Sequence, residues 1–165
     1  RDPRRFGLLL WTTADADRHP LIRHLGPEPL GDDFDGHYLY ERARGRRLAV
    51  KNFIMDGRIV VGVGNIYASE ALHGAGIRPS RPAGRISLAR MERLAGDIRD
   101  VLQAAIAEGG TTLRDFAHSD GSPGYFRQQL AVYDREGHDC LRCATPIRRV
   151  VLGQRSTYFC PACQR

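Results

Sequence analysis

The chain has 165 residues, with 25 Lys and Arg against 19 Asp and Glu, which gives a formal net charge of +6 at pH 7. This basic balance favours a nucleic acid as partner, ahead of an anionic membrane surface. No apolar run approaches the roughly 20 residues of a membrane span, and no secretory signal is visible, so we expect a cytoplasmic protein. The length allows one ordinary core and a small satellite module.

The first thirty residues predict a strand followed by a linker. Residues 6–11 form an apolar run typical of a strand, but no partner strand is near in sequence, and an isolated strand is not stable. The chain also begins with Arg1 rather than Met. We therefore expect the sequence to start inside a domain whose first part is missing. A polar connector punctuated by proline follows it.

The central part of the chain predicts a helical domain. Helices are expected within residues 32–47, 49–55, 66–75 and 87–108. The last is the clearest, because apolar residues recur at three- and four-residue steps, Ser87 can cap the start and a glycine pair ends the pattern. Helical elements joined by a glycine-rich turn suggest a helix-turn-helix variant.

The third helix is preceded by Gly-Val-Gly-Asn at residues 62–65. A dinucleotide site is excluded because Tyr67 stands where the third glycine is needed, and the Gly-Lys-Ser/Thr of a phosphate loop is absent. A glycine turn that feeds a helix still offers free backbone N–H groups to a DNA phosphate. A tight turn with Asn65 as an ordinary N-cap explains the same residues and, on the motif alone, is the simpler interpretation.

The last thirty residues carry two Cys-x-x-Cys pairs separated by sixteen residues. The cysteines are Cys140, Cys143, Cys160 and Cys163. This spacing predicts one structural zinc ion with four thiolate ligands. Two disulfides are the alternative, but they are rare in a reducing cytosol. The β-prone runs 147–152 and 155–159 predict a hairpin whose base the cysteines clamp, and His138 is interpreted as a surface histidine.

Several cations are candidates for binding an anion. Arg155 follows the hairpin turn, where its side chain can reach a phosphate, although such arginines are more often plain surface charges. Arg46 belongs to a basic cluster that is typical of a solvated face. Lys51 is a weaker candidate, as are Arg4 and Phe6, an Arg and an aromatic that together can grip a backbone and wedge between bases.

The chain resembles bacterial formamidopyrimidine-DNA glycosylase. The segments that carry the resemblance are DPRRFG at 2–7, LGPEPL at 25–30, VVGVGNIYASE at 60–70, GGTTLRDF at 109–116 and QRST at 154–157. They occur in the family's order and cover nearly the whole chain. Endonuclease VIII shares the helix-two-turn-helix and the zinc finger, but the run from Asn65 to Glu70 and the Gly-Tyr-Phe at 124–126 resemble the formamidopyrimidine branch.

The resemblance implies three parts. Residues 1–30 would be the closing strand of a missing N-terminal β-sandwich and a linker, residues 31–135 a mainly α helix-two-turn-helix domain, and residues 136–165 a zinc-ribbon β-hairpin. It implies base-excision repair by a monomer in the bacterial cytoplasm, at the nucleoid. The enzyme would remove 8-oxoguanine and formamidopyrimidines from double-stranded DNA and cleave the backbone at abasic sites by β,δ-elimination.

The resemblance also assigns site residues. Arg155 matches the zinc-finger arginine that grips phosphates at the lesion and donates a proton in δ-elimination. DNA-contacting positions are matched by Arg4, Arg46, Lys51 and Asn65. Phe6 matches the wedge that fills the gap left by the flipped base, and residues 117–129 match the loop that folds over that base.

The family's catalytic proline amine, its glutamate and its lysine have no counterpart in these residues, since Pro3 is internal. This chain alone is therefore expected to be inactive. Two other functions remain open. One is a stand-alone damaged-DNA-binding zinc protein, and the other is a ribosomal or transcription-associated zinc protein.

Overall fold

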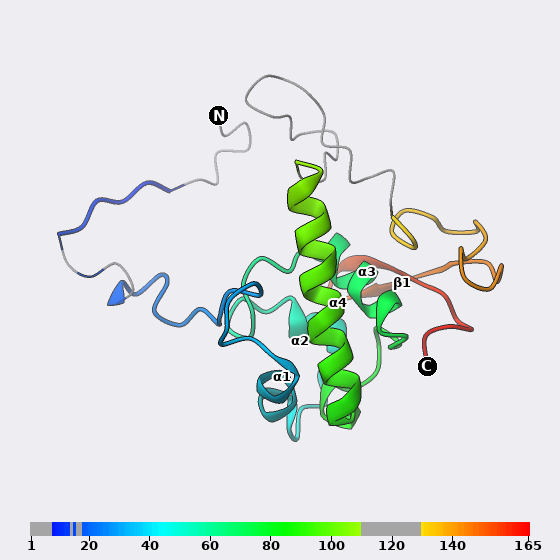
Figure 1. Ribbon diagram of the computed structural model, residues 1–165, viewed down its shortest axis with the longest axis horizontal. Coiled ribbons are helices and arrows are strands. Elements are labelled where there is room, and N and C mark those ends of the chain that lie inside the picture. Colours follow the sequence, from blue (N-terminus) through cyan, green and yellow to red (C-terminus); the bar gives the residue numbers. More distant parts are fainter. Residues whose placement is uncertain (1–7, 14, 16–17, 110–129) are drawn as a thin grey trace.

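The computed structural model describes residues 8–13, 15, 18–109 and 130–165. In the described part of the chain, four α-helices precede a two-stranded hairpin, and Figure 1 shows them around one long central helix. The elements are α1 (Gly36–Ala43), α2 (Val50–Ile54), α3 (Asn65–Gly74), η2 (Ala83–Arg85), α4 (Leu88–Ala107), β1 (Arg148–Leu152) and β2 (Arg155–Phe159). The predicted helices and the predicted hairpin are therefore confirmed, with ends that differ by a few residues.

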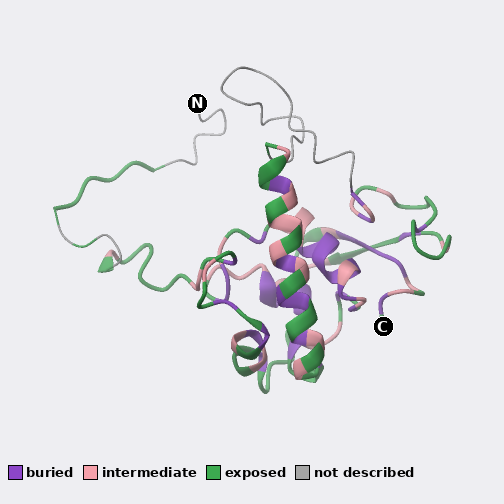
Figure 2. Ribbon diagram, in the orientation of Figure 1, coloured by how far each residue is buried: buried purple, intermediate pink, exposed green. Residues whose placement is uncertain are grey.

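Helix α4 is the centre of the helical body, and α1 and α3 pack along it. Its apolar stripe enters the core, and Met91, Leu94 and Ile98 are almost completely buried. In the last turn Ala105 is still buried, but Ile106 is 66% exposed. Figure 2 shows the buried residues gathered where α2, α3 and α4 meet. No described helix is both long enough and apolar enough to cross a bilayer.

The helix ends follow local chemistry. Asp35 caps α1 by accepting a hydrogen bond from the N–H of Tyr38 at 2.7 Å. Ser87 occupies the N-cap of α4, as predicted, but its side chain makes no capping hydrogen bond. Gly36 lets α1 lie directly on α4, because a Cβ there would collide with the backbone of Glu92.

The hairpin pairs β1 with β2 in antiparallel register, from Arg148 opposite Phe159 to Leu152 opposite Arg155. Gly153 and Gln154 form the turn, and both have positive φ, which is the geometry of a type I′ hairpin turn. The turn lies against α2, since a Cβ on Gly153 would be 2.8 Å from the Asn52 amide nitrogen. This contact brings β2 to the helical body.

The predicted N-terminal strand is not formed in the described residues 8–11. They pair with no described strand, and Leu9 is 96% exposed. An unpaired strand has no partner for its backbone groups, which explains its absence. The end of the connector is packed, however: the N–H of Gly26 donates to Gly57 O, and Pro29 is buried.

Candidate zinc centre and nucleic-acid interface

The four cysteine sulfurs lie within 4.8 Å of one another. The Sγ–Sγ distances are 3.3 Å for Cys143 and Cys163, 3.5 Å for Cys143 and Cys160, and 3.9 Å for Cys140 and Cys163. A tetrahedron with Zn–S bonds of about 2.3 Å has edges of roughly 3.8 Å, so the donor set fits zinc. All four cysteines are free, and the disulfide alternative is not formed.

The sulfurs differ in their surroundings. Hydrogen bonds from Thr145 lower the pKa of Cys143 to about 6. The pKa of Cys163 is raised to about 12, mainly by its hydrogen bond with Cys143 and then by burial. Crowded thiolates oppose one another's ionisation, and zinc supplies the positive charge that lets all four ionise.

The zinc module is attached to the helical body along α3. Gln164 bridges the two parts, accepting from the N–H of Cys160 at 2.8 Å and donating to Ile77 O at 2.9 Å. Arg142 donates to His73 O at 2.9 Å and to Gly74 O at 3.2 Å, two carbonyls at the end of α3. The module therefore docks on the carboxyl end of this helix.

Glu70 in the middle of α3 holds the segment that leads into the module. Its buried carboxylate accepts N–H hydrogen bonds from Ala131, Val132 and Tyr133 at 2.8 to 3.0 Å. Burial raises the pKa of Glu70, and these three hydrogen bonds oppose the rise. The sequence did not single out this residue, because a carboxylate in a predicted helix gives no signal that its partners lie about sixty residues away.

The amino end of α3 meets α2 and β2 in a polar cluster, which we call the basic seam: Lys51, Asn65, Arg155, Ser156 and Thr157. Lys51 and Thr157 are buried, whereas Arg155 is exposed. The ammonium of Lys51 donates to Asn65 Oδ1 and, at 2.7 Å, to Thr157 Oγ1. Asn65 Nδ2 donates to Ser156 O at 3.1 Å. The structure thus brings together three of the predicted site residues, from three different elements.

Lys51 is completely buried, although the sequence indicated only a helical position for it. Burial, and after it the positive charge of Arg155, lowers the pKa of Lys51 to about 8. Among the described residues, no carboxylate forms an ion pair with Lys51 or Arg155. Two positive charges therefore lie close together at the basic seam, and no carboxylate in the described part of the chain is paired with either of them.

Asn65 is the first residue of α3, and Gly64 occupies the N-cap position. The simpler interpretation of the motif, with Asn65 as N-cap, is therefore wrong. Gly62 has a φ of +78°, which an L side chain rarely adopts, so the turn needs this glycine. The Asn65 amide is directed to Lys51 and the hairpin rather than to the helix backbone.

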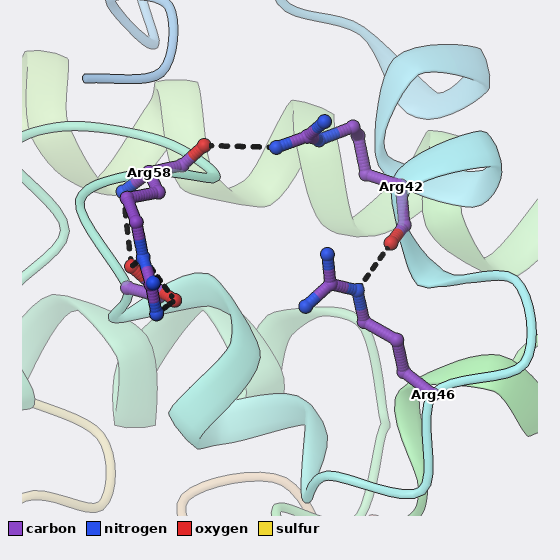
Figure 3. Close-up of polar contacts among 4 residues, drawn as sticks. Arg42, Arg46 and Arg58 are labelled. Carbon is purple, nitrogen blue, oxygen red and sulfur yellow. Dashed lines mark hydrogen bonds and ion pairs between the residues drawn. The ribbon is translucent and has the colours of Figure 1, made fainter. Parts of the chain in front are cut away.

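Arg46 lies in a second basic region, shown in Figure 3. It donates to Arg42 O at 2.7 Å, and its guanidinium lies 5.7 Å from the centre of the Phe53 ring. Arg42 donates to Arg58 O, and Arg58 pairs with Asp56 at 2.7 Å. Arg46, Arg47 and Arg85 line a shallow cleft of about 480 Å³.

Three predicted features lie outside the described residues. They are Arg4, Phe6 and the loop at 117–129. Two members of the basic seam, Ser156 and Thr157, were not singled out from the sequence, and neither was Tyr133, which contacts the seam. The hydrogen bond from Asn65 Nδ2 to Tyr133 OH, at 3.3 Å, adds the segment held by Glu70 to it.

Helices and a four-cysteine hairpin with this arrangement define a helix-two-turn-helix domain joined to a zinc finger. Residues 25–117 match the formamidopyrimidine-DNA glycosylase H2TH domain, and residues 137–165 match the zinc finger found in FPG and IleRS. The chain belongs to the formamidopyrimidine-DNA glycosylase family. The zinc finger carries one structural zinc ion, as its family and the four clustered cysteines require.

The chain is 62% identical to the formamidopyrimidine-DNA glycosylase of Methylococcus capsulatus over 164 residues, and 60% identical to that of Thioalkalivibrio sulfidiphilus. Each match covers 99% of this chain and 60% of the relative, so the chain spans about three-fifths of the relatives' length.

Solved structures of the family have the same fold. The MutM (Fpg) protein of Thermus thermophilus superposes with a TM-score of 0.90 at 42% identity, over 99% of this chain and 62% of that one. The Lactococcus lactis Fpg in complex with DNA containing an abasic site has a TM-score of 0.80 at 34% identity, over 88% of this chain and 53% of that one.

Proposed function

We propose that this chain is the DNA-gripping part of a bifunctional DNA glycosylase and abasic-site lyase of base-excision repair. The whole enzyme removes oxidised purines, namely 8-oxoguanine and formamidopyrimidines, and cleaves the backbone by β,δ-elimination. It acts as a monomer on double-stranded DNA in the bacterial cytoplasm. Family membership supports the proposal, as do related structures of the Lactococcus lactis protein bound to DNA that contains an abasic site or Fapy-dG.

The observation that carries the proposal is the basic seam. A buried ammonium costs free energy unless it is paired, and a neighbouring guanidinium raises that cost. Here Lys51 lies beside Arg155, with neutral oxygens of Asn65 and Thr157 as its main acceptors. Such an arrangement is stabilised by an anion. A phosphate of the DNA backbone is the anion that a basic DNA-binding chain meets.

Arg155 is the residue of the basic seam that reaches the phosphate directly. It is exposed at the start of β2, and its guanidinium presents donors in a rigid fork that matches a phosphate bidentately. A guanidinium stays charged at neutral pH and gives up its proton poorly, so this kind of side chain is a weak general acid. We therefore assign to it electrostatic stabilisation of the leaving phosphate during δ-elimination.

Lys51 and Asn65 lie deeper than Arg155 and favour the phosphate through their electrostatic effect. The Lys51 ammonium is covered by Asn65 and β2, so it adds positive potential beneath the phosphate without touching it. Asn65 begins α3, where backbone N–H groups and the helix dipole also favour an anion. Arg46 extends this surface along the duplex from the second basic region.

The test is DNA binding and chemistry measured separately. The 165-residue chain should bind a duplex with an abasic-site analogue more tightly than an undamaged duplex, and Arg155→Ala should abolish this preference. Borohydride trapping with the chain alone should give no covalent adduct, whereas the chain joined to the N-terminal part found in its relatives should give one. Equal binding to both duplexes would overturn the assignment of the seam, and a damage preference with no adduct in the joined protein would favour a binding protein without catalysis.

A further inference from the structure

One zinc-ligand cysteine is in contact with the helical body through a side chain. His73 lies in the last turn of α3 and is 2% exposed, and its Nε2 is 3.5 Å from the Sγ of buried Cys140. The other described hydrogen bonds to the ligand sulfurs come from within the zinc finger. Thr145 forms hydrogen bonds with Cys143, and the backbone N–H of Cys163 donates to the Sγ of Cys160 at 3.4 Å.

The direction of the His73 hydrogen bond follows from the chemistry of the ligand. A cysteine bound to zinc is a thiolate, which has no proton and acts only as an acceptor. The Nε2 atom must therefore carry a proton and donate it toward Cys140 Sγ. This fixes the tautomer of His73 whenever zinc is bound.

A histidine at this position needs a partner. Burying a ring nitrogen without a hydrogen bond costs free energy, so an apolar side chain would pack against the sulfur at lower cost unless the N–H has a role. Residues that hydrogen-bond metal ligands orient those ligands and tune their basicity. The main chain of His73 is held as well, because Arg142 from the same Cys-x-x-Cys loop donates to its carbonyl at 2.9 Å.

We propose that His73 is a positioning residue of the zinc centre: its Nε2–H donates to the Cys140 thiolate, holds the first Cys-x-x-Cys loop on α3 and couples zinc occupancy to the helix that begins with Asn65. The hydrogen bond withdraws charge from the sulfur, which makes the thiolate a weaker donor to the metal and less reactive. Loss of the bond leaves all four ligands in place. Its loss should therefore change the electron density on the sulfur and the rate at which zinc leaves the site.

The test uses the full chain loaded with Co(II), whose sulfur-to-metal charge-transfer band reports the electron density on the thiolates. His73→Phe keeps a ring of similar size and removes the donor. His73→Gln restores an N–H near the position of Nε2. Arg142→Gln is the control for docking, since it releases the α3 carbonyls and leaves the sulfur contact in place.

We expect the charge-transfer band of His73→Phe to move to lower energy, and zinc transfer to a chromophoric chelator to become about tenfold faster. His73→Gln should restore both toward wild type, and Arg142→Gln should leave the band unmoved. An unchanged band and rate in His73→Phe, or an equal band shift in Arg142→Gln, would overturn the proposal. The unmutated zinc protein gives an independent check even where a variant does not fold: ¹⁵N shifts of His73 should identify the Nε2–H tautomer, and the Nδ1–H tautomer contradicts it.

Discussion

The helical body and the zinc finger are held together by different means. The body, residues 26–109, buries a continuous apolar core that includes Phe34, Phe53 and Leu72. The finger and the segment that leads into it bury a cluster with a quarter as many residues, and two of its members are the zinc ligands Cys140 and Cys160. One region is stabilised by burial and the other by its metal, yet the basic seam takes residues from both. The function proposed for this seam therefore depends on the zinc finger being docked on the helical body.

The largest effect should follow from loss of the metal. Cys143→Ser, or chelation of zinc, should unfold the finger, because zinc contributes on the order of 10 to 16 kcal/mol in small zinc peptides. The helices should persist, since their core contains none of the cysteines. NMR should show loss of the β1 and β2 signals while circular dichroism retains the helical signal. Simultaneous melting of both regions would show that they form one cooperative unit.

The next effect concerns the contribution of the finger to the seam. Arg155→Ala should weaken binding to abasic-site DNA by about 100-fold or more, since each hydrogen bond to a charged group contributes about 1.5 to 3 kcal/mol. Arg155→Lys keeps the charge but loses the bidentate fork, and should fall between. Fluorescence anisotropy across a salt series measures both. Arg148→Ala, at the other end of the hairpin, is the matched control. If it weakens DNA binding as much as Arg155→Ala does, Arg155 contributes only a general surface charge.

Lys51 tests the contribution of the body to the same seam. Its pKa falls from the ordinary 10.5 to about 8 on folding, first through burial and then through the charge of Arg155. Between pH 8 and 10.5 the folded chain binds fewer protons than the unfolded chain, so the free energy of unfolding should rise with pH. The rise from this group is on the order of 3 kcal/mol. Urea unfolding at both pH values should show it in the wild type, and Lys51→Met should remove it.

Local elements of both regions could be predicted from the sequence, whereas the contacts between the two regions could not. The α4 stripe and the cysteine spacing are local patterns, and both predicted their elements to within a residue or two. The seam and the docking contacts join residues far apart, such as Lys51 with Thr157 and His73 with Cys140. Periodicity carries no information about such pairs. The family resemblance predicts a DNA contact for Lys51, and only the packing shows that its ammonium lies beneath the surface.

The smallest effect tests whether the helical body is independent of the metal. In Gly36→Ala the new Cβ would meet Glu92 Cγ at 2.6 Å and the Glu92 backbone as well, so α1 must move away from α4. Forcing extra atoms into a close contact costs about 1 to 3 kcal/mol. We expect thermal unfolding of the helices at a lower temperature, with zinc content and the hairpin signals unchanged.

Gly96→Ala is the matched control for this change, because it adds the same methyl group to α4 at a position where a Cβ meets nothing within 4 Å. A glycine inside a helix destabilises it by about 0.5 to 1 kcal/mol relative to alanine, so this variant should be more stable than the wild type. Opposite signs for the two substitutions would locate the effect of Gly36 in the contact between α1 and α4. A stabilising Gly36→Ala would mean that α1 is not held against α4, and the body would then lack the independent core on which its contrast with the zinc finger rests.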